Sequence, residues 1–338
     1  MNNKRFGCLG IGLVVLLVLS LALNFIFVMA GSATMATTAM GVRTQLPKFE
    51  ESLVAPGADG ATDKIAVISL RGIITGLEPG SIGETMVEDL KLQLDQAVGD
   101  AKVKAIVLHI DSPGGEVTAS DTIYNAVKRV RAKKPVVVYM GSVAASGGYY
   151  VACGSKWIVA NETTFTGSIG VIMQALNYEG LMGKVGLATV TFKSGKMKDM
   201  LSGSRQPTEE EKAYLQALIM QTYGKFVGIV AKERNLPEQQ LRDGIADGRV
   251  VSGTDALAAK LVDQLGEVED AYAKAKEFGN AAGASVIRYE APFKLGRLLR
   301  LLGESEAGKS KIEVNLMKSL ASPLEVGKLY FLPGFYAP

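Results

Sequence analysis

The apolar positions of this chain fall into short continuous runs that alternate with longer segments of helical spacing. Continuous apolar runs occupy residues 64–75, 104–110 and 135–140 and are rich in β-branched residues. Between them, residues 84–98 and 119–132 repeat their apolar positions with the period of an amphipathic helix. Strands that are apolar throughout are buried on both faces, and their alternation with helices is typical of a parallel sheet. The pattern therefore predicts an α/β fold with helices flanking a parallel sheet.

The second half of the chain continues this pattern with shorter elements. Shorter apolar runs predict further strands at 157–160, 168–172 and 187–192. Thr208 and Glu211 have capping-box spacing, which predicts the start of a long helix that ends near Asn235. Residues 247–266 have the pattern of a turn followed by a capped helix. We find no internal repeat at a fixed period.

The amino-terminal segment predicts a membrane anchor. Lys4 and Arg5 precede a stretch from Leu9 to Ala30 without a charged residue, which is long enough to span a bilayer as a helix. A small-residue tract follows and contains triplets compatible with a signal-peptide cleavage site, but the apolar stretch is longer than that of a cleaved signal. We expect an uncleaved single-pass anchor. Its flanking cations keep the amino terminus cytoplasmic and place the rest of the chain on the extracytoplasmic side of the cell membrane.

These boundaries divide the chain into four parts. Residues 1–30 form the predicted anchor, and residues 31–62, rich in small residues, are interpreted as a juxtamembrane linker. The regular α/β pattern fills residues 63–290. The remaining part, 291–338, has scattered apolar residues and is interpreted as an interaction or docking tail.

Charge and composition exclude several classes of function. The net charge of +3 is too small to indicate nucleic-acid binding, and the basic cluster at 128–134 lies at a predicted helix end, where cations complement the helix dipole. The two cysteines, Cys8 and Cys153, and the single histidine, His109, provide neither a disulfide framework nor metal-ligand spacing. We therefore expect no metal and no cofactor.

Ser146 is the first candidate for chemistry. It follows the predicted strand at 135–140 and precedes a probable helix within the sequence Ala-Ala-Ser-Gly-Gly. Small residues around a serine at a strand-to-helix turn resemble a nucleophile elbow, where they tolerate a strained backbone. The motif alone also fits a small residue at a close packing contact. Its position at the carboxyl end of a parallel strand, where active sites gather, favours the nucleophile.

The sequence Asp-Ser-Pro-Gly-Gly at 111–115 ends the neighbouring predicted strand. Gly114 and Gly115 allow the backbone to approach a reacting carbonyl closely, and with Gly147 they are candidates for an oxyanion hole. The same residues also form an ordinary turn. Two glycine-rich ends on one sheet edge favour the catalytic interpretation.

A nucleophilic serine requires a base, and His109 is more readily explained as a strand residue within an apolar run. Lysine replaces histidine where its environment keeps the amine neutral near pH 7. Lys193, Lys196 and Lys198 lie in a glycine-containing turn at 193–200. A lysine-rich turn is also typical of a solvated loop, so these residues alone leave the base open.

Five motifs together resemble signal peptide peptidase A, a family of membrane-anchored serine proteases related to the Clp protease and crotonase folds. The motifs, in order along the chain, are DSPGG, GSVAASGGYYVA, TGSIGV, KSGKMKD and DGRVVSGTDALAAKLVD. They cover roughly residues 64–270. The resemblance implies a Clp protease/crotonase-like sheet, with Ser146 as nucleophile and Lys198 as general base. It also implies that Ser168 helps to orient the lysine, and that the oxyanion is bound at Gly114, Gly115 and Gly147, leaving open which glycine of the pair donates.

The same resemblance implies partners and substrates. This is the short form with a single repeat, which implies a ring-shaped or dome-shaped homo-oligomer whose serine and lysine come from neighbouring protomers. Released signal peptides and other hydrophobic, unfolded segments are the implied substrates.

Three other interpretations remain. A crotonase-like acyl-CoA enzyme shares the fold and would use a carboxylate such as Glu116, although an extracytoplasmic domain has no access to coenzyme A. A non-catalytic membrane scaffold is expected to lack the serine or the lysine, and this chain has both. A Ser/Lys protease specialised for another membrane protein fits the same residues.

Overall fold

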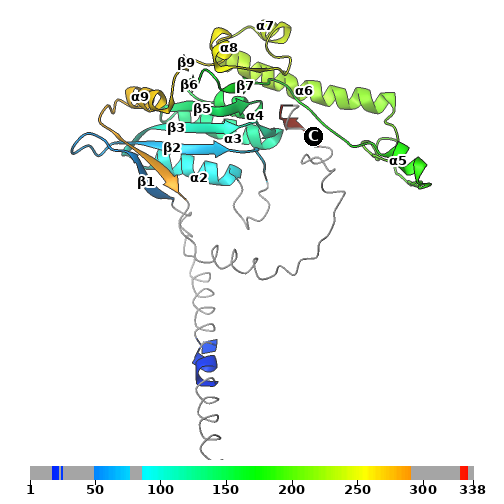
Figure 1. Cartoon of the computed structure of the whole chain (residues 1–338), viewed down its shortest axis with the longest axis horizontal. Coiled ribbons are helices and arrows are strands. Elements are labelled where there is room, and N and C mark those ends of the chain that lie inside the picture. The colour runs from blue at the N-terminus through cyan, green and yellow to red at the C-terminus, as the bar shows by residue number, and fades with distance from the viewer. Residues whose placement is uncertain (1–16, 23, 26–48, 77–85, 291–327, 334–338) are drawn as a thin grey trace, which may run out of the picture. The chain divides into compact units, whose positions relative to one another are not determined.

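The computed structural model describes residues 17–22, 24–25, 49–76, 86–290 and 328–333 (Figure 1). The chain divides into two units, residues 1–47 and 48–338. In the first unit the described residues are helical. Among the described parts of the chain, no helix combines the length and the apolar character needed to cross a bilayer. The predicted anchor at 1–30 lies largely outside the described residues.

The second unit is built on a nine-stranded sheet, which runs through the middle of Figure 1 in the order β1-β10-β2-β3-β5-β6-β9. From β10 to β9 every neighbouring pair is parallel, whereas β1 joins β10 antiparallel. Off this path, β7 pairs with β5 in parallel and β8 pairs with β7 antiparallel. The strands are β1 Glu50–Ala55, β2 Lys64–Arg71, β3 Val103–Ser112, β5 Val136–Ala145, β6 Trp157–Ala160, β7 Phe165–Gly167, β8 Val250–Val251, β9 Gln264–Leu265 and β10 Ser285–Glu290.

The predicted α/β fold with a mostly parallel sheet is confirmed, and both faces of the sheet are covered. In β2, Ile65 and Val67 are buried with α9, whereas Ile68 and Leu70 are buried on the other face with α2, α3 and α4. Each such side chain contributes about 1.5–3 kcal/mol when it is fully buried, which explains why the apolar run of β2 is nearly continuous and does not alternate with polar residues. The covering helices are α2 Met86–Gly99, α3 Val117–Arg131, α4 Gly147–Ala152 and α9 Val268–Phe278.

The long helix α6 (Glu209–Arg234) begins and ends as predicted. The Thr208 hydroxyl accepts a hydrogen bond from the Glu211 amide (3.2 Å), and the Glu211 carboxylate accepts one from the Thr208 amide (2.8 Å). At the other end Asn235 adopts the left-handed conformation with φ 53°. Near that end Phe226 is buried in the main core, and the Glu233 carboxylate pairs with Arg131 of α3 at 2.9 Å. Two short helices follow, α7 (Glu238–Asp243) and α8 (Gly253–Ala258).

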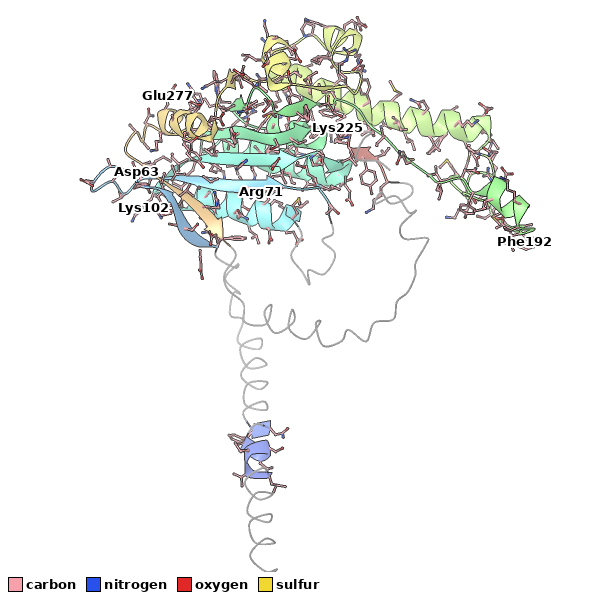
Figure 2. The ribbon with its side chains drawn as sticks, in the orientation of Figure 1. Asp63, Arg71, Lys102, Phe192, Lys225 and Glu277 are labelled. Atoms are coloured by element: carbon pink, nitrogen blue, oxygen red, sulfur yellow. The ribbon has the colours of Figure 1, made fainter. Side chains whose placement is uncertain are left out.

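Residues 173–208, which we call the arm, lead from the sheet to the start of α6 and include the short helix α5 (Glu179–Lys184). The strands predicted at 168–172 and 187–192 are wrong, because neither range forms a strand. Val190 is 80% exposed and Phe192 is 95% exposed. Phe192 lies at the end of the arm remote from the sheet (Figure 2). Strand-forming residues need a neighbouring strand and a surface to pack on, and the arm provides neither within one chain.

The predicted linker at 31–62 is also corrected, because β1 lies within it and forms the edge of the sheet. β1 has exposed and half-buried residues but no fully buried one, as fits a strand at the edge of the sheet, and it lacks a continuous apolar run. At the opposite end of the chain, β11 (Tyr330–Phe331) pairs antiparallel with β4 (Gly115–Glu116), with Phe331 opposite Gly115. The described part of the predicted docking tail therefore lies against the second glycine of the Asp-Ser-Pro-Gly-Gly sequence.

Candidate active site

Ser146 is the single residue between a strand and a helix. β5 ends at Ala145 and α4 begins at Gly147, and Ser146 itself has φ 51° and ψ −112°. Its amide donates a hydrogen bond to the Gly167 carbonyl (2.8 Å), and its carbonyl accepts one from the Tyr150 amide (2.8 Å). This backbone conformation costs a residue with a side chain about 1–3 kcal/mol, and it is kept only where the surrounding structure enforces it.

The Ser146 hydroxyl has no hydrogen-bond partner. The residue is 1% exposed, and its Oγ is a buried polar atom without a donor or acceptor within reach among the described residues. A buried unpaired hydroxyl costs about 1–3 kcal/mol, so packing alone does not account for a serine here. A hydroxyl that must attack a substrate has a reason to remain unpaired.

The three candidate oxyanion glycines lie against one another. A Cβ on Gly114, which has φ 106°, would lie 2.5 Å from the Gly147 amide nitrogen. A Cβ on Gly147 would lie 3.1 Å from the Gly115 amide nitrogen. The strand ends at 111–115 and 146–148 therefore meet with backbone against backbone, which side chains at these positions would prevent.

Two serines that the sequence analysis did not single out hold this contact in place. The Ser112 hydroxyl donates to the Gly72 carbonyl (2.6 Å) and accepts a hydrogen bond from the Gly114 amide (3.1 Å). The Ser120 hydroxyl lies 2.6 Å from the position of a Cβ on Gly147. Ser112 belongs to the DSPGG sequence, which is the only signal that could have found it.

The last described strand covers the glycines. The Phe331 carbonyl oxygen occupies the space that a Cβ on Gly114 would need. On the β4 side, the Glu116 carboxylate accepts hydrogen bonds from Lys328 (2.9 Å) and Thr75 (3.3 Å). The chain's own segment β11 thus pairs as an added strand beside Gly115. Strand addition of this kind is a common way for proteins to bind extended peptides.

Tyr149 and Tyr150 anchor the helix that follows Ser146. The Tyr149 hydroxyl donates to the Leu261 carbonyl (2.9 Å), and the Tyr150 hydroxyl donates to Asp121 (2.6 Å). Burial raises the pKa of the Tyr150 phenol, and its hydrogen bond to the Asp121 carboxylate raises that pKa further. Both phenols therefore remain neutral donors that fix α4 on its neighbours.

Ser168 lies beside Ser146 in the sheet. β5 and β7 pair with Ala145 opposite Gly167, so Ser146 and Ser168 are the residues that directly follow these two adjacent strands. Ser168 is 3% exposed with φ 49°, and its amide donates to the Arg249 carbonyl (2.8 Å). The structure thus brings Ser146, Ser168 and the three glycines together.

Lys198 is not part of this group within one chain. It lies in a turn of the arm, where its amide donates to the Gly195 carbonyl (3.0 Å), and its side chain is exposed. Among the described residues we find no hydrogen bond or ion pair of its ammonium group. A buried Ser146 and an exposed Lys198 do not pack together in this chain.

His109 lies on β3, away from the group around Ser146. Its ring contacts Tyr139 edge to face, with ring centroids 5.1 Å apart. Burial is the main cause that lowers the pKa of this imidazole, with Arg71 adding to the shift. Among the described residues the Ser146 hydroxyl has no hydrogen-bond partner, so His109 does not bond to it in this arrangement.

Comparison with known proteins places the chain among proteases. The model of peptidase family S49 matches residues 128–282, and the Clp protease model matches residues 68–165. A candidate signal peptide peptidase SppA from Enterococcus faecium is 34% identical over 295 residues, which cover 86% of this chain and 85% of the relative.

The chain is also similar to one further protease sequence and to one solved structure. Protease 4 from Salmonella typhi is 39% identical over 232 residues, which cover 68% of this chain and 36% of that protein. The structure of a ClpP1 mutant from Listeria monocytogenes is 17% identical and superposes with a TM-score of 0.41, covering 61% of this chain and 93% of the other.

Proposed function

Because the chain belongs to peptidase family S49 and is a serine endopeptidase, we propose that Ser146 is its nucleophile and Lys198 its general base. The unpaired, buried hydroxyl of Ser146 on a strained strand-to-helix turn is the observation that carries this proposal. Lys198 is proposed from its place in the KSGKMKD motif and from its ammonium group, which is free of ion pairs among the described residues.

The reaction needs the lysine as a neutral amine. Lys198 Nζ takes the proton of the Ser146 hydroxyl while Oγ forms a bond to the peptide carbonyl carbon. The carbonyl oxygen becomes an oxyanion. When the C–N bond breaks, the Lys198 ammonium returns the proton to the leaving amine and an acyl-enzyme remains. Water then hydrolyses the ester by the same transfer of a proton to and from Lys198, which releases the second product and restores Ser146.

We place the oxyanion between the amides of Gly115 and Gly147. Within the chain the Gly114 amide donates to Ser112 Oγ and Gly115 pairs with Phe331 of β11, so the assignment of Gly115 to the substrate requires β11 to give way when the substrate binds. Each amide donor in such a site contributes about 2.7–4 kcal/mol to stabilising the transition state. Ser168, next to Ser146 in the sheet, has the proposed role of orienting the lysine.

The lysine of each site is proposed to come from a neighbouring protomer of a ring-shaped homo-oligomer. Lys198 and the buried Ser146 do not meet in one chain, and the arm that carries Lys198 is rich in exposed apolar side chains. Those more than 60% exposed are Leu176, Leu181, Val185, Leu187, Val190 and Phe192. An apolar surface of this kind marks an interaction site, and a second copy of the chain with its own arm is the proposed occupant.

The proposal includes a membrane location. The uncharged stretch from Leu9 to Ala30 is proposed to anchor the protease in the cell membrane with its amino terminus cytoplasmic and its catalytic domain extracytoplasmic. Released signal peptides and other hydrophobic, unfolded segments are the proposed substrates. These substrates are extended apolar peptides. The chain's own strand at 330–331 is also an extended apolar segment, and it pairs with β4.

A digest of a synthetic signal peptide tests the dyad. We expect cleavage by the wild type and by Lys196→Ala, and none by Ser146→Ala or Lys198→Ala. Lys196 is the matched control because it lies in the same turn and pairs with Glu210. Full cleavage by Lys198→Ala contradicts the dyad. If the protein cuts a folded membrane protein and not the signal peptide, it is instead a Ser/Lys protease specialised for another membrane protein.

Mixing the two inactive variants tests the shared site. Oligomers assembled from Ser146→Ala and Lys198→Ala chains contain neighbouring pairs with one intact serine and one intact lysine, and we expect cleavage to return in the mixture. A mixture that stays inactive places serine and lysine in one protomer. A fluorophosphonate probe separates the protease from an acyl-CoA enzyme, because it labels an activated Ser146 only.

A further inference from the structure

The residue after Lys198 is a carboxylate that the arm holds firmly. Asp199 Oδ1 accepts a hydrogen bond from Lys193 Nζ (2.7 Å) and one from Arg205 Nη2 (2.7 Å). Its other oxygen, Oδ2, accepts one from Arg205 Nε (2.9 Å). Both oxygens of Asp199 are therefore occupied by cations other than Lys198.

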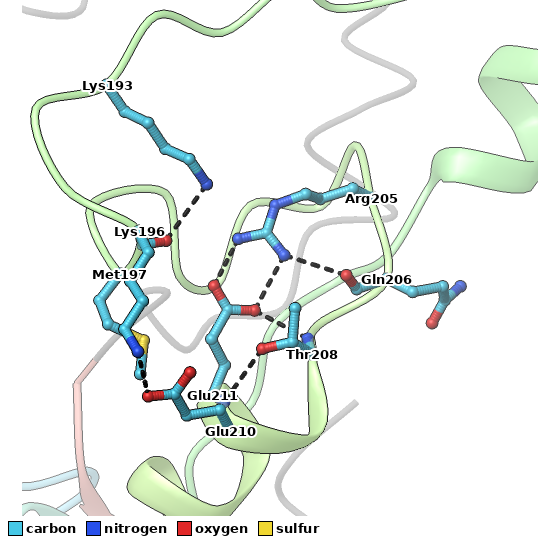
Figure 3. A pocket seen from close by; sticks show the side chains of 8 residues that line it. All are labelled: Lys193, Lys196, Met197, Arg205, Gln206, Thr208, Glu210 and Glu211. Carbon is cyan, nitrogen blue, oxygen red and sulfur yellow. Dashed lines mark hydrogen bonds and ion pairs between the residues drawn. The ribbon is translucent and has the colours of Figure 1, made fainter.

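Arg205 connects this carboxylate to the start of α6. Its Nη1 donates to Glu211 Oε2 (2.8 Å), and its Nη2 also pairs with Glu211 (Figure 3). The Glu211 side chain is 2% exposed and also caps the helix through Thr208. The Arg205 guanidinium is thus fixed between a buried carboxylate of α6 and Asp199 of the lysine turn.

A free carboxylate next to a general-base lysine would oppose its function. An opposite charge within about 4–6 Å favours the charged form of a group and raises the pKa of a lysine. Lys198 must lose its proton to activate Ser146, so pairing with Asp199 would keep the base protonated. The ion pairs with Arg205 and Lys193 hold the pKa of Asp199 well below its usual range, so this carboxylate is ionised and attractive unless it is occupied.

We propose that Arg205 is a positioning residue of the Ser146–Lys198 dyad: its guanidinium occupies the Asp199 carboxylate, so that Lys198 stays unpaired. This inference rests on the proposed dyad. The geometry of the guanidinium is essential to it, because a planar fork fills both carboxylate oxygens at once and an ammonium group cannot.

The other cations close to Lys198 in the sequence, Lys193, Lys196 and Arg205, are already paired. Lys196 pairs with Glu210 of α6, and Lys193 bonds both Asp199 and the Lys196 carbonyl (3.1 Å). Among the described residues, the carboxylates that pair with the cations of this segment are Asp199, from the turn itself, and Glu210 and Glu211, from α6. Asp199 is the one adjacent to Lys198, and Arg205 binds two of the three.

The test is the pH dependence of Ser146 labelling by a fluorophosphonate in the full-length protein. Labelling of the wild type should rise with pH as Lys198 loses its proton. In Arg205→Ala we expect the rise to move up by about one pH unit or more, so that labelling at pH 7 is about tenfold slower. Arg205→Ala/Asp199→Asn should return the curve to its wild-type position, because the carboxylate that pairs with Lys198 is then gone.

Controls separate this role from support of the turn. Arg129→Ala removes an arginine–aspartate pair on the far helices α2 and α3 and should leave the curve unchanged. Arg205→Lys, which keeps a cation beside the buried Glu211, provides a variant that folds if Arg205→Ala does not, and should give an intermediate shift. Equal slowing of Arg205→Ala at every pH, or no recovery in the double variant, overturns the role of Arg205 alone. Normal labelling of Lys198→Ala overturns the dyad and this role together.

Discussion

The ring of Phe331 stacks on the ring of Tyr150, with centroids 4.8 Å apart and an interplanar angle of 27°. Phe226 of α6 completes the cluster, with its ring centroid 4.7 Å from that of Phe331. Tyr150 lies four residues after Ser146 on the helix that begins at Gly147. The cluster therefore joins the last described strand of the chain to the helix that follows Ser146.

Replacing Phe331 by alanine should release β11 from β4. Each aromatic pair contributes about 0.5–1.5 kcal/mol beyond its buried area, and Phe331 is also fully buried. The Ile172 amide, which donates to the Tyr330 carbonyl (3.0 Å), should then exchange its hydrogen faster. Phe278→Ala, in the separate cluster with Trp157, is the control and should leave that amide protected. Unchanged exchange in Phe331→Ala would mean that backbone pairing alone holds the strand.

Gly114→Ala should disable the site and destabilise the fold. Its Cβ would meet the Phe331 carbonyl oxygen and the Gly147 amide nitrogen, and its φ of 106° disfavours a side chain. Gly60→Ala is the matched control, because Gly60 has φ 75° and nothing within 4 Å of its Cβ position. We expect the free energy of unfolding to fall by about 1–3 kcal/mol more in Gly114→Ala than in Gly60→Ala. Denaturant unfolding and fluorophosphonate labelling measure both effects, and equal losses in the two variants would rule out a steric cause.

The strain at Ser146 predicts an order of stabilities. Glycine tolerates φ 51° and ψ −112° without the cost that a Cβ incurs, so Ser146→Gly should be about 1 kcal/mol or more stable than Ser146→Ala. Both variants lack the hydroxyl, which isolates the backbone contribution. Thermal unfolding of the two inactive proteins gives the comparison. In an unstrained strand or helix a glycine variant is less stable than the alanine variant. A Ser146→Gly protein less stable than Ser146→Ala would therefore show that the turn is not strained.

The arm predicts a variant that separates folding from assembly. Phe192 is 95% exposed, so Phe192→Asp should leave the fold of the chain intact while placing a charge in the proposed interface. We expect a smaller oligomer by light scattering and a loss of peptide cleavage, since Lys198 would no longer reach a neighbour's Ser146. Leu53→Asp, at a residue 67% exposed on β1, is the control for an apolar-to-charged change elsewhere. An unchanged mass for Phe192→Asp would remove the arm tip from the interface.

The fold could be predicted where buried side chains leave a regular pattern of apolar residues in the sequence. The strands near 64–71 and 104–110 carry nearly continuous apolar runs because each face packs on helices, and α6 carries its capping box within the four residues 208–211. The edge strand β1 has no such run, and the apolar residues at 187–192 have no strand beside them. Local strand propensity does not distinguish an apolar segment that packs against another chain from one that joins the sheet of its own chain.

The candidate site divides in the same way. Ser146 and the glycines could be found because a tight turn and a close backbone contact need particular small residues at fixed spacing. The roles of Ser112, Arg205 and Phe331 depend on contacts between segments far apart in the sequence or on side-chain geometry. No periodicity or motif reports those contacts, so only the folded arrangement reveals them.

The position of β10 between β1 and β2 has a consequence for the way the chain is made. β1 and β2 leave the ribosome early, but the strand that joins them follows about two hundred residues later. At about 5–20 residues per second, synthesis of that stretch takes on the order of tens of seconds. Throughout that time the apolar β2 presents an unpaired edge. A chain that stops before residue 285 therefore retains this open edge, and it should aggregate rather than fold as a smaller protein.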